Sequence, residues 1–158
     1  MVGKGVKPEL ITSEHFFDFD NGYFVNEYLQ SNNENIYVAG DCAIIYDKSH
    51  EKKWKIPLWP LAGKQGIIAG YNMVNGNKFS YDGDIPVNSF SVFDNFIITG
   101  GKKKIDENEK DLYFEEKDFN YNKNSFTKKI YKFDGRLKGY FLLNDLKDAG
   151  KYYYDILK

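Results

Sequence analysis

The stretch Asn35-Ile36-Tyr37-Val38-Ala39-Gly40-Asp41-Cys42-Ala43 decides the fold. Its apolar run, Ile36–Val38, predicts a short buried strand. The strand is expected to end at Gly40, where the absent side chain lets a ligand approach the backbone closely. Asp41 then places a carboxylate just past the carboxyl end of the strand, where open α/β sheets bind ligands. Because an isolated Gly-Asp pair is also typical of a polar turn, the interpretation depends on the flanking sequence.

The flanking segments carry a resemblance to a known family. Gly5-Val6-Lys7-Pro8 precedes the stretch, and Trp59-Pro60-Leu61-Ala62-Gly63-Lys64-Gln65-Gly66 follows it. In order and spacing the three segments resemble the FAD- and NAD(P)-dependent oxidoreductases of the pyridine-nucleotide disulfide reductase superfamily. Residues 134–145 resemble the end of the small C-terminal domain in one branch, the NAD(FAD)-dependent dehydrogenases near rubredoxin reductase and the NAD(P)H nitrite reductase large subunit. That branch usually has Gly where this chain has Asn144.

The resemblance implies an α+β chain with two parts. Residues 1–84 are expected to be the C-terminal part of an α/β FAD-binding domain. Residues 85–158 are expected to be a small strand-rich domain, closed by a C-terminal helix, that packs over the flavin or mediates association, for example in a homodimer. The implied function is electron transfer from NAD(P)H through FAD to an acceptor. Rubredoxin, another iron–sulfur or flavoprotein partner, oxygen and a sirohaem domain all remain open as acceptors.

Neither Gly-rich dinucleotide-binding turn of that superfamily is visible in the sequence. The nearest candidate, Gly3-Lys4-Gly5-Val6-Lys7-Pro8, has Pro8 where a third glycine should lie, and proline would break a continuing helix. We therefore expect a fragment whose first partner is the N-terminal remainder of the same protein, and which alone is inactive. The alternative is a non-enzymatic small α+β interaction domain in which the Gly-Asp pair is coincidental.

The resemblance also implies roles for individual residues. Asp41, next to Gly40, is expected to accept hydrogen bonds from the ribitol hydroxyls of FAD, because a carboxylate is a strong acceptor. Trp59, Pro60 and Leu61 begin a predicted helix whose N-terminus is expected to face the flavin ring. No catalytic residue and no metal site is predicted in this chain.

Composition narrows the remaining classes. The formal net charge of -1 gives no reason to expect nucleic acid, and no apolar run is long enough to span a membrane. Cys42 is the single cysteine, is predicted to pack as a small hydrophobe, and is consistent with a reduced, cytoplasmic location. His15 and His50 are assigned no catalytic role.

Local patterns predict the elements of the first part. Asn21-Gly22 predicts a hairpin between His15–Phe19 and Tyr23–Leu29. Residues 47–55 read as a charged surface loop. The best helix is Pro60–Asn75, ended by Gly76. Its expected apolar face is Leu61, Ile68, Tyr71 and Val74 or Asn75, and its interior glycines predict close packing against a sheet or a flat ligand.

After Pro86 the pattern predicts successive strands. They are expected at Asn88–Thr99, Asp111–Glu116, Ser125–Phe133 and Leu137–Leu143, as a β-meander in which Gly100–Lys104 forms a solvated turn. Asp134-Gly135 predicts a two-residue hairpin turn. Asp145–Lys158 predicts an amphipathic helix capped by Asn144 or Asp145. Its apolar face is Leu146, Ala149, Tyr153 and Ile156.

Overall fold

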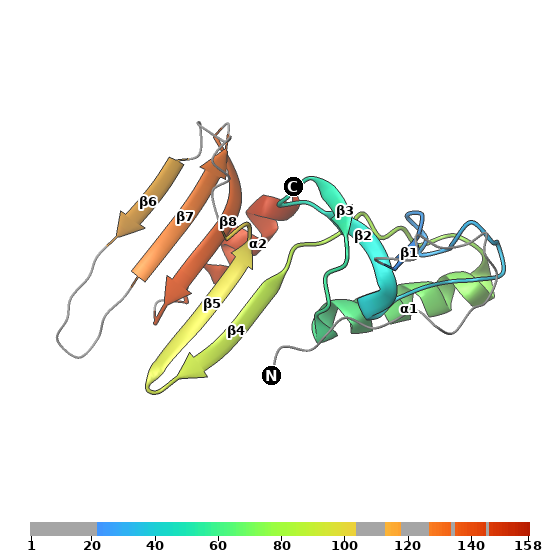
Figure 1. Ribbon diagram of the computed structural model, residues 1–158, viewed down its shortest axis with the longest axis horizontal. Coiled ribbons are helices and arrows are strands. Elements are labelled where there is room, and N and C mark those ends of the chain that lie inside the picture. Colours follow the sequence, from blue (N-terminus) through green and yellow to red (C-terminus); the bar gives the residue numbers. More distant parts are fainter. Residues whose placement is uncertain (1–21, 104–112, 118–126, 134, 145) are drawn as a thin grey trace. The chain divides into compact units, whose positions relative to one another are not determined.

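The computed structural model describes residues 22–103, 113–117, 127–133, 135–144 and 146–158 (Figure 1). The chain divides into two compact units. Unit 1 comprises the described residues up to Asp47 together with Lys52–Asp84, and unit 2 comprises Lys48–Glu51 together with Ile85–Lys158. Most of the predicted Asn21-Gly22 hairpin, including His15–Phe19, lies outside the described residues, as does the segment Gly5–Pro8.

Unit 1 contains a small sheet and one long helix, α1 (Trp59–Asn75). The sheet has the order β1-β2-β3, formed by β1 (Tyr23–Phe24), β2 (Ala43–Asp47) and β3 (Lys52–Trp54). β1 runs parallel to β2, and β3 runs antiparallel to it. The helix lies along this sheet (Figure 1). Their shared core includes the side chains of Tyr23, Leu29, Val38, Ile45 and Leu61.

Two predictions for this region are wrong. Ile36–Val38 is not a strand, because Tyr37 makes only an isolated bridge to Gln30, and Val38 donates its N–H to the Leu29 carbonyl. These backbone groups are satisfied within a local loop, so no ladder forms. The charged segment 47–55 is not a simple surface loop, since Lys52–Trp54 forms β3 and pairs with β2.

The predicted helix is confirmed, and its predicted face is partly right, since Leu61 and Ile68 pack in the core of unit 1. α1 ends at Gly76, whose φ is +71°, as a glycine stop requires. Tyr71 and Val74 are exposed. The buried positions are Leu61, Gln65, Ala69 and Asn72. No atom lies within 4 Å of a Cβ built on Gly63, Gly66 or Gly70, so among the described residues nothing packs closely on these glycines.

Unit 2 is a sheet covered by a helix, with the strand order β4-β5-β8-β7-β6. Its strands are β4 (Val87–Val92), β5 (Asn95–Gly101), β6 (Tyr113–Lys117), β7 (Thr127–Phe133) and β8 (Arg136–Leu143). The predicted meander is wrong, because β8 pairs with β5 and separates it from β7. The single strand expected at Asn88–Thr99 is also wrong, because a turn at Phe93-Asp94 splits it into the β4–β5 hairpin.

The C-terminal helix is α2 (Ala149–Leu157), and its apolar face packs on the sheet as predicted. Its predicted cap is wrong: Asp148 occupies the N-cap position, and Asn144 instead accepts the Phe96 N–H at 2.9 Å. The solvated Gly100–Lys104 turn is partly wrong as well. β5 extends to Gly101. Lys102 is buried, and its N–H donates to the Lys138 carbonyl.

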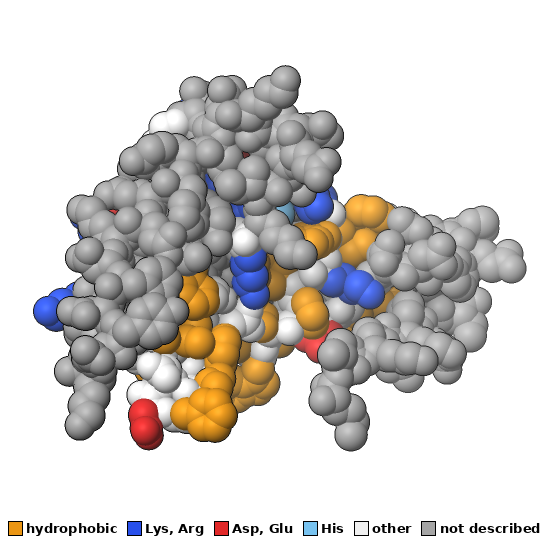
Figure 2. Space-filling view, turned by 60° about the vertical axis from the view of Figure 1, so that its left-hand side comes forward, with side chains coloured by type: hydrophobic (Ala, Val, Ile, Leu, Met, Phe, Trp, Pro, Cys, Tyr) orange, Lys and Arg blue, Asp and Glu red, His pale blue; other side chains and the backbone are white. Residues whose placement is uncertain are grey.

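The two sheets are separate, and each unit has its own hydrophobic core. The second core contains Ile85, Tyr140, Leu142 and Ile156. Figure 2 shows exposed hydrophobic side chains gathered where the β4–β5 hairpin ends. They belong to Phe90, Val92, Phe93 and Phe96, and Phe93 is 95% exposed. The chain is thus a mixed α+β protein with two small sheets and a C-terminal helix.

Candidate functional site

The Gly-Asp pair lies in a single 3₁₀ turn, η1 (Gly40–Cys42), between an extended residue and a buried strand. Ala39 has φ −140° and ψ 157°, and β2 begins directly after Cys42. Asp41 therefore precedes a strand of the sheet, although it was expected to follow one. Its side chain is exposed, so the carboxylate can be reached by a ligand.

Gly40 connects this turn to α1 by a hydrogen bond and a close backbone approach. Its φ is +81°, a region that favours glycine, and a Cβ built there would lie 3.3 Å from the Ala62 Cβ. The Gly40 N–H donates to the Gln65 Oε1 at 2.7 Å. The space left by the missing side chain is thus used for close approach of the helix, and the backbone N–H is already paired within the protein.

Gln65 is itself held in place from its other side. Its side chain is 1% exposed, and its Nε2 donates to the Tyr81 hydroxyl at 3.3 Å. Burial raises the pKa of Tyr81, so this hydroxyl stays protonated over the physiological range. Neither role was predicted, because Gln65 interrupts the apolar periodicity of the helix and Tyr81 contacts it across 16 positions of sequence.

The start of α1 lies beside the turn. Leu58 occupies the N-cap position with extended geometry, and the Ala62 N–H donates to its carbonyl at 3.0 Å. Backbone N–H groups in the first turn of a helix have no partner within the helix. They give this end a partial positive charge. Such an end suits a negatively charged group of a ligand.

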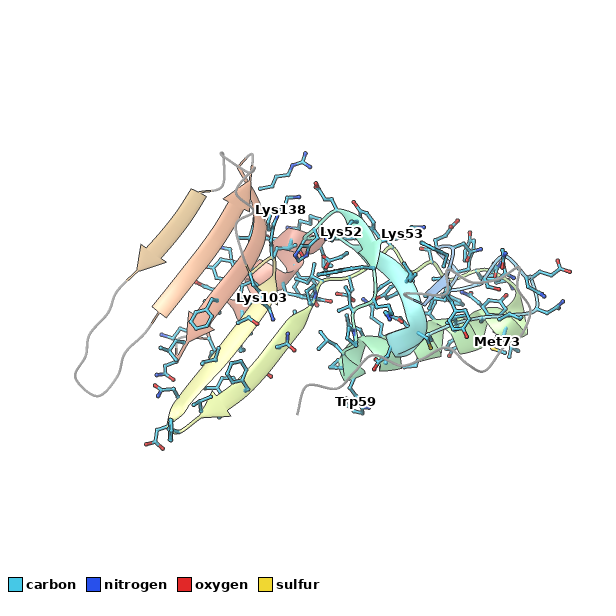
Figure 3. The ribbon with its side chains drawn as sticks, in the orientation of Figure 1. Lys52, Lys53, Trp59, Met73, Lys103 and Lys138 are labelled. Carbon is cyan, nitrogen blue, oxygen red and sulfur yellow. The ribbon has the colours of Figure 1, made fainter. Side chains whose placement is uncertain are left out.

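The side chains at this end differ in what they can contact. Trp59 is 88% exposed and projects from the start of α1 (Figure 3). Pro60 is also exposed, whereas Leu61 is buried in the core of unit 1. Leu61 can therefore offer a ligand its backbone N–H, but its side chain serves packing.

Other chemically reactive side chains are used structurally. Cys42 is half-buried, packs against the core of unit 1, and points its thiol at the Ala39 carbonyl at 3.8 Å. His50 Nδ1 lies 3.0 Å from Ser49 Oγ. His15 lies outside the described residues. The described ranges hold no group of three or more His, Cys, Asp or Glu side chains that could bind a metal, nor any helix long and apolar enough to cross a membrane.

Comparison with known proteins shows which family the chain resembles. Residues 1–66 match the family described as pyridine nucleotide-disulphide oxidoreductase. Over 107 residues the chain is 35% identical to an NADH oxidase of Mycoplasma pneumoniae, an alignment that covers 65% of this chain and 22% of the relative. By these matches the chain is similar to the pyridine nucleotide-disulphide oxidoreductases.

A second curated relative matches almost the whole chain. The NADH-dependent phenylglyoxylate dehydrogenase subunit epsilon of Aromatoleum evansii is 30% identical over 154 residues, covering 95% of this chain and 35% of that subunit. The chain thus spans about a fifth to a third of the length of these two curated relatives.

Solved structures of the superfamily share the fold. A pyridine nucleotide-disulfide family oxidoreductase from Enterococcus faecalis superposes with a TM-score of 0.70 at 17% identity, covering 88% of this chain and 35% of that one. The NAD-dependent persulfide reductase from A. fulgidus gives a TM-score of 0.67 at 22% identity, covering 86% of this chain and 27% of that one. At this identity the likeness establishes the fold alone.

Proposed function

We propose that the chain is part of a flavoprotein oxidoreductase that passes electrons from NAD(P)H through FAD to an acceptor. One observation carries the proposal: the exposed carboxylate of Asp41 and the open N-terminus of α1 are fastened together through Gly40 and Gln65. A carboxylate can bind the hydroxyls of the ribitol chain. A helix N-terminus can bind the flavin ring when the ring carries negative charge.

The residue roles follow from this arrangement. Asp41 would accept hydrogen bonds from the ribitol hydroxyls of FAD. The first backbone N–H groups of α1, including that of Leu61, would face the flavin ring, with Trp59 and Pro60 beside it. When bound, FAD supplies the redox chemistry, and the protein contributes binding, orientation and electrostatics. No residue of this chain is assigned a catalytic role.

The remainder of the same polypeptide is the proposed partner of unit 1 and the source of the NAD(P)H site. The relatives are about three to four and a half times as long as the matched segment, as their 35% and 22% coverage implies. The solvent face of α1 supports this proposal because it is apolar: Trp59, Ile67, Met73 and Val74 are each more than 60% exposed. A helix that is apolar on nearly all sides is typical of a buried position in a larger domain.

Unit 2 is proposed to be the small C-terminal domain, with a boundary near residue 85. Its exposed Phe90, Phe93 and Phe96 on the β4–β5 hairpin support a role in association, either in a homodimer or with an acceptor protein. The acceptor stays open within the NAD(FAD)-dependent dehydrogenase branch. The names of relatives range from NADH oxidase to NAD(P)H sulfur oxidoreductase. A cytoplasmic location is proposed from the single cysteine.

The test compares two proteins: the 158-residue chain and the longer natural polypeptide that contains it. We expect the longer protein to purify yellow, with flavin absorbance that NADH or NADPH bleaches under anaerobic conditions. We expect the 158-residue chain to bind FAD weakly and to oxidise neither nucleotide. NADH turnover by the pure 158-residue chain, or a longer protein that never retains flavin, would refute the proposal.

A further inference from the structure

We propose that Gln65 is the positioning residue that sets the orientation of the Asp41-bearing turn toward the flavin. The inference rests on the proposed function for its ligand, but its geometry is independent of any ligand. It concerns Gln65 and Tyr81, neither of which is proposed to contact FAD. It explains why a polar side chain occupies the buried face of α1.

The carboxamide of Gln65 can make its two hydrogen bonds in only one orientation. Its Oε1 accepts the Gly40 N–H at 2.7 Å, while its Nε2 donates to the Tyr81 hydroxyl at 3.3 Å. A reversed carboxamide would point an N–H at the N–H of Gly40, which is repulsive. Because the Gly40 N–H can only donate, it selects the orientation in which Oε1 faces Gly40, and the Tyr81 hydroxyl then accepts from Nε2.

Burial makes the loss of either hydrogen bond costly. Gln65 is 1% exposed and Tyr81 is 6% exposed, so water cannot replace a lost partner freely. The left-handed backbone of Gly40 and its close approach to Ala62 leave the turn little freedom on that side. The hydrogen bond that Gly40 donates to Gln65 thus holds the residue that directly precedes Asp41.

Asn72 provides a matched control on the same helix. It is fully buried on the same face of α1 and makes more hydrogen bonds, donating to the carbonyls of Tyr28 and Phe79 and accepting from the N–H groups of Lys78 and Phe79. None of these partners belongs to η1. Loss of Asn72 should therefore weaken unit 1 without changing the Gly40 turn.

The decisive experiment measures amide hydrogen exchange at Gly40 by NMR in the 158-residue chain, relative to the core amide of Ile45. Gln65→Met keeps the volume and removes both polar groups, so we expect Gly40 to exchange about fivefold to tenfold faster. Asn72→Met should leave that ratio unchanged. Gln65→Glu should restore slow exchange, because its carboxylate can accept from both Gly40 and the Tyr81 hydroxyl.

A second arm measures FAD affinity in the longer flavoprotein by fluorescence titration. We expect Gln65→Met to weaken FAD about tenfold, and Asn72→Met to change it less than twofold. Unchanged Gly40 exchange in Gln65→Met, or equal acceleration in Asn72→Met, would overturn the inference, as would full FAD affinity in Gln65→Met. If the unaltered longer protein bound no FAD, the proposed function would fail, while Gly40 exchange would still decide whether Gln65 positions the turn.

Discussion

Lys64 Nζ lies 2.8 Å from Asp84 Oδ2, and this pair joins α1 to the last residue of unit 1. The Asp84 side chain is fully buried, whereas that of Lys64 is 47% exposed. The same ammonium lies 5.4 Å from the centroid of the Tyr81 ring. Asp84 also donates its N–H to the Tyr46 carbonyl at 3.1 Å, so the chain end of unit 1 is fixed from two sides.

Removing Lys64 should lower the free energy of unfolding by more than the loss of an exposed ion pair does. Lys64→Met keeps the aliphatic stem and removes the ammonium that lies 2.8 Å from the buried Asp84 carboxylate. We expect the free energy of unfolding to fall by about 1–3 kcal/mol, below the full range for a fully buried pair because Lys64 is half-exposed. Urea denaturation followed by far-UV circular dichroism measures the change.

Lys53→Met is the matched control, because Lys53 is an exposed lysine on β3 of the same unit. Its effect should stay within about 0.5 kcal/mol. Replacing both members of the buried pair, as Lys64→Met with Asp84→Asn, should recover part of the lost stability. Equal midpoints for Lys64→Met and Lys53→Met would show that the pair does not hold the chain end.

In unit 2, the ion pair between Glu51 and Lys138 predicts a pH dependence. The hydrogen bond from Lys138, and then its charge, lower the pKa of Glu51 below its ordinary value of about 4.5. The stabilisation is therefore complete above the ordinary value and is lost as the pH falls through the lowered one. Because Glu51 is 55% exposed, we expect less than about 1 kcal/mol.

Glu51→Gln tests this dependence. The difference in unfolding free energy between the unaltered chain and Glu51→Gln should be largest near neutral pH and should shrink on acidification. Glu34→Gln, which changes an exposed glutamate in a loop of unit 1, should show no such trend. A Glu51→Gln difference that grew as the pH fell would reverse the sign and contradict the assignment.

Two glycines near the candidate site should respond to alanine with opposite signs. Gly40→Ala would force an L side chain into φ +81° and place its Cβ 3.3 Å from the Ala62 Cβ, so we expect a loss of about 1–2 kcal/mol. Gly63→Ala adds a methyl where no atom lies within 4 Å, so the gain in helix propensity should stabilise the chain by about 0.5–1 kcal/mol. Stabilisation by both substitutions, measured by thermal unfolding, would contradict the left-handed geometry of Gly40.

Local signals predicted the helices better than the sheets. α1 was readable because Pro60 and Gly76 mark its two ends within the sequence itself. The turn at Phe93-Asp94 was not, because Phe93 adopts φ +52°, a conformation that an aromatic residue rarely takes. The place of β8 between β5 and β7 depends on pairing across long sequence distances, which periodicity does not encode.

The roles of the candidate-site residues stay a prediction, and the contacts that hold these residues could not be predicted from the sequence. The flanking motifs pointed to Asp41 and Trp59, and both are exposed residues of unit 1. The buried hydrogen bonds of Gln65 and Asn72 were missed, because a polar side chain is stable inside only when distant partners reach it. Gly40 lies 25 positions before Gln65, and nothing local in the helix indicates that partner.

The last prediction separates Asp41 from its neighbour Cys42 in the longer flavoprotein. Asp41→Ala removes an acceptor that should bond one or two ribitol hydroxyls, which would then be poorly paired within the site. From the range for charge-assisted hydrogen bonds we expect a loss of roughly 2–4 kcal/mol in FAD binding, which is a factor of tens to several hundred. Fluorescence titration of FAD into the purified apoprotein measures it.

Cys42→Ser is the control for that substitution, since Cys42 packs against the core and is assigned no contact with FAD. It should change FAD affinity far less, and any effect should come from burying a hydroxyl in place of a thiol. Retained flavin and hydride transfer in Asp41→Ala, combined with loss of both in Cys42→Ser, would contradict the role of the Gly-Asp turn. That result would instead identify the Cys42 thiol as a redox group, because the two side chains are adjacent and only one of them can be oxidised.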